Sequence, residues 1–61
     1  DLVERALRPL TPRERAAVVL TCYVGLSSQE ASRALGIRSG AVRTLAARAR
    51  VAMKTAMEES R

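Results

Sequence analysis

Residues 27–50 read SSQEASRALGIRSGAVRTLAARAR, and this stretch predicts two helices joined by a short turn. Ser27 and Glu30 have the spacing of a capping box, in which a hydroxyl and a carboxylate three residues apart each accept a backbone N–H. We therefore expect a short helix over residues 28–35. Gly36 tolerates a positive φ and is expected to end this helix.

A second helix is expected after the turn, over residues 39–58, with Ser39 as its candidate N-cap. Two helices joined by a three-residue turn that contains glycine form a helix-turn-helix, which we place at residues 28–50. Apolar side chains recur every three or four residues of the second helix, as on one face of an amphipathic helix. They are Val42, Leu45, Ala46, Ala49, Ala52, Met53 and Ala56.

Another helix start lies at residues 11–14, which read TPRE. The threonine suits an N-cap, the proline suits the first helical position, and the glutamate completes a capping box. A helix is expected over residues 12–24, ended by Gly25. Residues 2–7 read as part of a further helix. The sequence thus predicts an all-α fold of three or four helices, with residues 1–61 forming a single domain.

Length and composition limit what the chain does. Its 61 residues suffice for one domain with a thin core. It has no His, Trp or Phe and only one Cys, so the usual acid–base and metal-ligand sets are missing. We therefore expect no enzyme, no metal or other cofactor, and no small-molecule substrate. One Cys permits no internal disulfide, and a cytoplasmic location is expected.

The apolar runs of the chain and its first residue add two expectations. The longest apolar run, residues 16–20, is far shorter than the ~18 residues of a membrane span, so no membrane is expected as a partner. The chain begins with Asp1 rather than Met, which indicates a fragment of a larger protein.

The positive charge is concentrated in one part of the chain. The formal net charge is +5, yet residues 1–30 carry four arginines against four acids. Residues 31–57 carry five arginines and one lysine and no acid. A local basic block of this kind indicates a polyanionic partner.

The exposed side of the second helix carries residues suited to reading DNA. In helix-turn-helix proteins the N-terminal end of this helix enters the major groove. Arg43 fits a bidentate contact with guanine O6 and N7, or otherwise a phosphate. Thr44 fits a base edge, a phosphate or a thymine methyl, whereas Ala47 fits only an apolar contact.

Other residues are expected at phosphates, which set register and affinity without reading sequence. The backbone amides of residues 39–41 lie at a helix N-terminus, where anions bind. The side chains assigned to phosphates are those of Arg33, Arg38, Arg48 and Arg50.

The remaining apolar residues are assigned to the interior. Leu35, Ile37 and Val42 are expected to pack the two helices of the helix-turn-helix together. Cys22 is expected to be a small buried residue, and Tyr23 a core residue rather than a stacking platform for bases.

Five short motifs follow one another along the chain: LTPRER at 10–15, GLS at 25–27, LGI at 35–37, GAVR at 40–43 and RAR at 48–50. In this order and spacing they resemble region four of bacterial RNA polymerase sigma factors, and most closely the compact extracytoplasmic-function group. The resemblance spans residues 7–53.

The resemblance implies a function and a set of partners. Region four of sigma factors binds the minus-35 element of promoter DNA, docks on the flap of the RNA polymerase β subunit, and is often masked by an anti-sigma factor. By position, the base-facing sites of the family fall on Arg43, Thr44 and Ala47. The backbone-facing sites fall on Ser39, Ala41 and Arg48, with Arg38 beside them in the turn.

The chain departs from the family pattern at several positions. Ala31 and Ser32 stand where Ile and Ala are usual, which implies a smaller and more polar core. Leu45 and Ala46 replace a basic residue and a large apolar one, so a phosphate contact is lost and Leu45 is expected to turn inward. Val24 replaces a polar residue and is expected to be exposed. These departures imply either weaker DNA contact or extra surface for a protein partner.

Three other functions stay open at this point. A LuxR-type DNA-binding domain also fits residues 11–14, although the motif at 48–50 is sigma-like and the LuxR-type pattern expects a His soon after position 42. A sigma-like domain used mainly for protein interaction would have its thin core completed by a partner. A basic membrane-surface helix is disfavoured, because residues 39–57 lack Trp and Phe and their apolar face is mostly Ala.

Overall fold

The structure, a computed structural model, describes residues 2–59. The elements of this described range are all helical, which confirms the predicted all-α fold. They are α1 (Leu2–Leu7), α2 (Pro12–Val18), a π-helical segment η1 (Val19–Val24), α3 (Ser28–Leu35) and α4 (Ser39–Glu59). The predicted helix-turn-helix consists of α3, the turn and the first half of α4.

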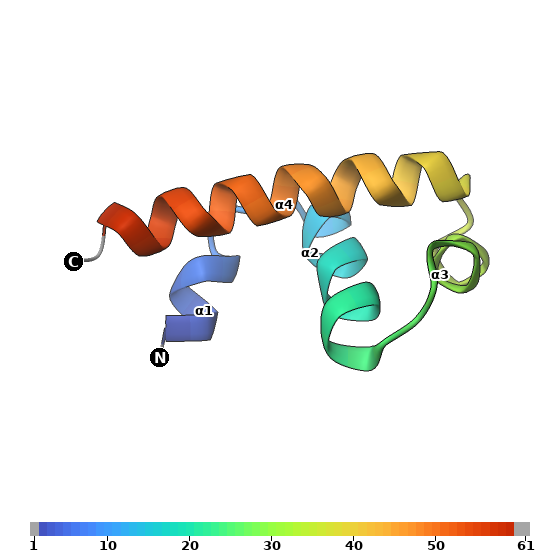
Figure 1. Cartoon of the computed structure of the whole chain (residues 1–61), viewed down its shortest axis with the longest axis horizontal. Helices are drawn as coiled ribbons and strands as arrows, with labels where there is room; N and C mark the ends of the chain where they lie inside the picture. Colours follow the sequence, from blue (N-terminus) through green and yellow to red (C-terminus); the bar gives the residue numbers. More distant parts are fainter. Residues whose placement is uncertain (1, 60–61) are drawn as a thin grey trace.

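The other helices are assembled on the long helix α4 (Figure 1). α1 packs on its C-terminal part, α2 on its middle and α3 at its N-terminal end. At 1.5 Å per residue, the 21 residues of α4 span about 31 Å of the 36 Å length of the molecule. The first turns of α4 therefore lie at one end of the molecule, beside α3.

Two capping boxes set the starts of α2 and α3, as predicted. The Thr11 N–H donates to Glu14 Oε1 at 2.9 Å, and the Glu14 N–H donates to Thr11 Oγ1 at 3.2 Å. Ser27 and Glu30 form the same pair of bonds at 2.9 and 3.1 Å. Each box satisfies two backbone amides near the start of the helix.

Two glycines end helices in the left-handed conformation, also as predicted. Gly25 has a φ of 90° and Gly36 a φ of 70°. The N–H groups of Gly36 and Ile37 both donate to the Ser32 carbonyl, the second at 3.1 Å. The chain thereby turns sharply from α3 into α4, which run in clearly different directions (Figure 1), and Ile37 packs against the core.

The start of α4 differs from the prediction by one residue. The Arg38 carbonyl accepts the N–H of Val42 at 3.1 Å, which is the first bond of the helix. Arg38 therefore occupies the N-cap position, and Ser39, the predicted cap, is the first helical residue.

The core consists mainly of small side chains in two clusters. The cluster that joins α2, α3 and α4 contains Ala17, Ala31, Val42 and Ala46. The cluster that joins α4 to the N-terminal half of the chain contains Leu10, Val18 and Ala49. Leu35 and Ile37 pack against the first cluster, and Leu45 turns inward beside Ala46, all as expected. Small contact residues allow helices to approach closely.

The end of the second helix differs from the prediction in its geometry. The helix runs to Val24, but its last six residues are π-helical. The Thr21 hydroxyl donates to the Ala17 carbonyl at 2.7 Å, and such back-bonding competes with the backbone ladder and bends helices. α2 and η1 lead away from α4, so the far end of η1 lies outside the region where the described helices pack on one another (Figure 1).

The predicted burial of Cys22 and Tyr23 is wrong for this reason. Cys22 is exposed, and 55% of the Tyr23 surface is accessible. Val24 is 61% exposed, as predicted. The last three residues of η1, Cys22 to Val24, therefore form an exposed uncharged surface.

Candidate nucleic-acid interface

The N-terminal half of α4 has a buried side and an exposed side. Val42, Ala46 and Ala49 are buried, whereas Thr44 and Ala47 are exposed. Because successive residues of an α-helix are rotated by about 100°, Thr44 lies almost opposite Val42, and Ala47 almost opposite Ala49. The core therefore turns Thr44 and Ala47 outward, and Arg43, the third predicted base-reading residue, is also exposed.

The middle of this exposed side is uncharged. Thr44, Ala47 and Val51 follow one another at spacings of three and four residues, so they form one line along the helix. Val51 is 68% exposed, although valine is usually buried. Val51 was not among the predicted residues, although its spacing of seven residues from Thr44 places it on the same side of the helix.

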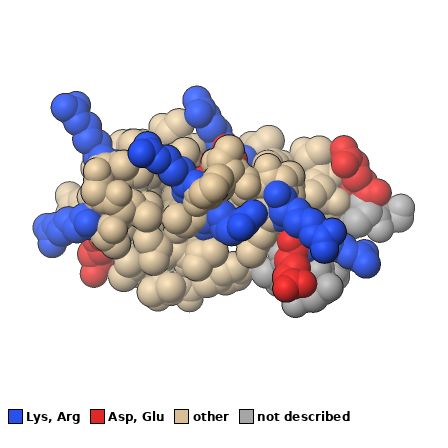
Figure 2. All heavy atoms as spheres, turned by 180° about the vertical axis from the view of Figure 1, so that it is seen from behind, with Lys and Arg blue, Asp and Glu red and all other residues tan. Residues whose placement is uncertain are grey.

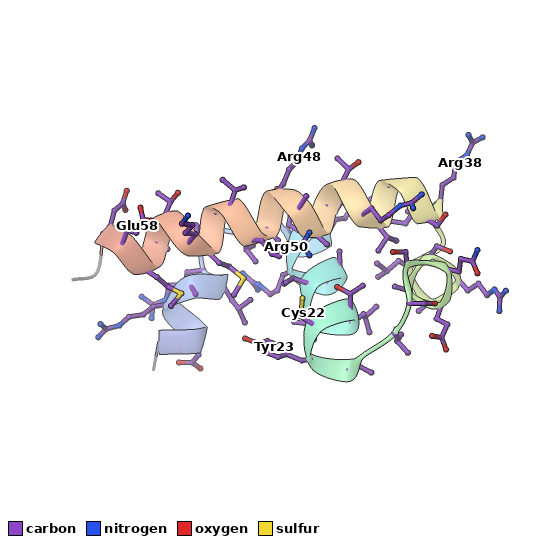
Figure 3. The ribbon with its side chains drawn as sticks, viewed as in Figure 1. Cys22, Tyr23, Arg38, Arg48, Arg50 and Glu58 are labelled. Carbon is purple, nitrogen blue, oxygen red and sulfur yellow. The ribbon has the colours of Figure 1, made fainter. Side chains whose placement is uncertain are left out.

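Basic side chains flank this uncharged line on both sides. Arg43, Arg50 and Lys54 share one flank at helical spacing, and Arg48 lies on the other. All four are exposed. Figure 3 shows Arg38 and Arg48 projecting from the same edge of α4, whereas Arg50 leaves the helix on a different side.

The positive charge extends along the molecule rather than gathering at a point. Figure 2 shows basic side chains along the length of the molecule, with fewer acidic ones, mainly toward its two ends. Arg38 and Lys54 are sixteen residues apart, which corresponds to about 24 Å along α4. The acids Glu58 and Glu59 lie at the C-terminal end of α4, remote from its first turns.

Arg33 stands apart from these rows because it belongs to α3. Its side chain is exposed, as predicted for a phosphate contact. The pKa of Glu30 is lowered chiefly by the hydrogen bond from the Ser27 backbone, then by that from the Ser27 hydroxyl, and to a lesser degree by the charge of Arg33.

The first turn of α4 completes the predicted set. Ala41 is exposed and Ser39 is partly buried. The amides of residues 39–41 precede the first intrahelical donor, Val42, so the helix itself supplies them with no acceptor. They lie beside the exposed Arg38, at the end of the molecule where α3 and α4 meet.

Comparison with known proteins identifies the family. A family model described as Sigma-70, region 4 matches residues 1–53. The chain belongs to this family. Sigma region 4 is a helix-turn-helix domain that binds DNA and acts with RNA polymerase in transcription initiation. No curated protein and no solved structure matches the chain.

The sigma region 4 match contains all of the predicted DNA-contacting residues. It covers α1, α2, η1 and α3 and residues 39–53 of α4. Lys54, which continues one basic flank, is the first residue beyond it. The matched residues of α4 thus include Thr44, Ala47 and Val51 of the uncharged line and all of its basic flanks except Lys54.

Other features of this sigma region 4 lie away from the interface. A shallow depression of about 300 Å³ is lined by Glu4, Leu7, Arg8 and Arg15, and Arg15 Nη2 donates to the Leu7 carbonyl at 3.3 Å. Across residues 2–59, no helix combines the length and apolar character needed to span a membrane. In the same range no cluster of His, Cys, Asp and Glu is arranged to hold a metal ion.

Proposed function

We propose that this sigma region 4 binds the minus-35 element of promoter DNA, in a sigma factor of the extracytoplasmic-function type, and so directs RNA polymerase to its start sites. The proposal rests on the first half of α4. There, Thr44 and Ala47 form an uncharged line between Arg43 and Arg48, and the buried Val42 holds this side of the helix outward. An uncharged line between cations suits a helix that lies in the major groove between two phosphate backbones.

The proposed base contacts come from three exposed residues. Arg43 pairs with guanine O6 and N7, which is the commonest specific contact of arginine with DNA. Ala47 lies one turn later and contacts an apolar group such as a thymine methyl. Thr44 follows Arg43 in the sequence, lies on the same line as Ala47, and contacts a neighbouring base.

The proposed phosphate contacts surround these bases. The backbone amides of residues 39–41 donate hydrogen bonds to a phosphate at the start of α4, where the helix dipole favours an anion. The exposed side chains that contact phosphates are those of Arg33, Arg38, Arg48 and Arg50.

We also propose two protein partners, the flap of the RNA polymerase β subunit and an anti-sigma factor. We further propose that the protein is not an enzyme and acts in the cytoplasm. The exposed Tyr23 and Val24 support the proposed protein partners, because they leave an aromatic and an aliphatic side chain uncovered on η1. η1 leads away from α4, so a protein bound there would leave the DNA-facing side of α4 accessible.

Duplex binding over a range of salt concentrations tests the DNA-binding proposal. A duplex that contains a minus-35 element should bind more tightly than a scrambled duplex of the same composition. If the four arginines contact one phosphate each, the logarithm of the affinity should fall with the logarithm of salt with a slope of about −3.6. Equal affinities for the two duplexes at every salt concentration would contradict specific recognition.

Two matched arginine variants separate base contacts from phosphate contacts. Arg43→Ala should reduce discrimination at one base pair by roughly 1–3 kcal/mol. Arg48→Ala should weaken all duplexes alike and reduce the salt slope by about 0.9. If Arg43→Ala weakened every duplex equally, the assignment of Arg43 to a base would be wrong.

Retention on the isolated β flap tests the polymerase contact. The chain should be retained, and substitution of Tyr23 and Val24 by serine should abolish retention without changing duplex affinity. Unchanged retention of that double variant would refute the assignment of this surface to the polymerase.

A further inference from the structure

Among the proposed base-contacting residues, Thr44 is distinguished by a hydroxyl group that already donates a hydrogen bond within the helix. Its hydroxyl donates to the Gly40 carbonyl at 3.1 Å. A hydroxyl has one proton and two lone pairs. With the proton directed into the helix, the oxygen faces outward only as an acceptor.

We propose that Thr44 selects a base with an amino group on its major-groove edge, and this inference rests on the DNA-binding function proposed above. Adenine N6 and cytosine N4 donate hydrogen bonds in the major groove, whereas guanine and thymine present carbonyl acceptors there. An oxygen restricted to accepting pairs with adenine or cytosine. Opposite guanine O6 or thymine O4 it would place two acceptors face to face, which leaves both without a donor.

The same bond within the helix is formed by two other threonines of the chain. Thr21 donates to the Ala17 carbonyl at 2.7 Å, and Thr55 donates to the Val51 carbonyl at 3.1 Å. Thr55 is also exposed on α4, but it lies three helical turns beyond Thr44, outside the half of the helix that enters the groove. Thr55 therefore offers a control with the same geometry and no proposed base.

Selection from a library of random duplexes with the full 61-residue chain tests the proposal. The wild type should select adenine or cytosine over guanine or thymine at one position, by about two- to tenfold for a single hydrogen bond. Thr44→Val has the same shape without the hydroxyl and should lose selection at that position alone. Thr44→Ser retains the acceptor and Thr55→Val leaves Thr44 intact, so both should select as the wild type does.

Several results would overturn the proposal. If Thr44→Val selects as the wild type does and Thr44→Ser does not, the methyl group rather than the oxygen reads the base. If the wild type selects guanine or thymine at the position that Thr44→Val alters, the hydroxyl donates instead. If neither Thr44→Val nor Thr44→Ser alters the selected sequence, Thr44 does not contact a base. If the wild type selects no sequence at all, the proposed DNA recognition itself fails, and this inference fails with it.

Discussion

Replacing Val42 with alanine tests whether one buried side chain holds α4 in place. Val42 is fully buried and packs with Ala17, Ala31 and Ala46, which are too small to fill the space it would leave. Loss of two buried carbons costs about 1.6 kcal/mol in transfer free energy, and the cavity raises the expected loss to about 2–3 kcal/mol. A domain of this length is stable by roughly 3–9 kcal/mol, so the midpoint of thermal unfolding should fall by about 10–20 °C.

Val51→Ala is the matched control, because it removes the same atoms from the same helix at a site that is 68% exposed. Its free energy of unfolding should stay within about 0.5 kcal/mol of the wild type. Urea and thermal unfolding followed by helical circular dichroism give both values. Equal destabilisation by the two substitutions would refute the assignment of Val42 to the core contact that orients α4.

Three further predictions concern helix ends. Ser27→Ala removes one half of a capping box and should cost about 1 kcal/mol in urea unfolding, and an unchanged midpoint would count against the box. Gly36→Ala should destabilise by about 1–2 kcal/mol because its φ is 70°, whereas Gly40→Ala, helical and with open space around it, should stabilise by up to about 1 kcal/mol. The same sign for both would contradict this. The pKa of Glu30 is lowered below 4.5 chiefly by the Ser27 backbone hydrogen bond, then by the Ser27 hydroxyl. The stability that this ionised carboxylate contributes is present above pH 4.5 and is lost as the pH falls through the lowered pKa. The free energy of unfolding should therefore fall more steeply with decreasing pH in the wild type than in Glu30→Gln. Parallel curves of unfolding free energy against pH would refute this prediction.

The helix boundaries could be predicted from the sequence because the signals that set them are local. A capping box needs only two side chains three residues apart, and a left-handed glycine needs only its own φ. Thr11, Ser27 and Gly36 act as predicted for this reason. The predicted N-cap of α4, Ser39, is wrong by one residue, because Arg38 occupies the cap position. A backbone carbonyl of any residue can accept the first helical hydrogen bond, so residue type alone does not identify this cap.

The exposure of η1 could not be predicted in the same way, because burial depends on which elements lie opposite. Cys22 and Tyr23 follow an apolar helix, and their residue types favour the interior. They are exposed because α2 and η1 lead away from α4. That direction depends on the packing of Ala17 and Val18 on α4, between residues far apart in the sequence.

The exposure of the candidate interface was predictable, but its finer arrangement was not. Helical periodicity alone places Arg43, Thr44 and Ala47 away from the core. The structure adds the line that continues to Val51 and the hydrogen bond from Thr44 to the Gly40 carbonyl. The second depends on a side-chain rotamer, which a pattern of residue types does not specify.

The small core and the basic surface of α4 are two consequences of one arrangement. Because the fully buried residues of α4 are Val42, Ala46 and Ala49, the buried strip of the helix is narrow, and most of its circumference is left exposed. That exposed surface has room for cations on both sides of an uncharged line. The six cations of residues 31–57 repel one another in the free domain, whose thin core offers little to oppose this repulsion. Bound phosphates would remove the repulsion, and a partner that binds only the folded state adds its binding free energy to stability. If these cations contact phosphates as proposed, DNA binding would therefore raise the stability of the folded domain.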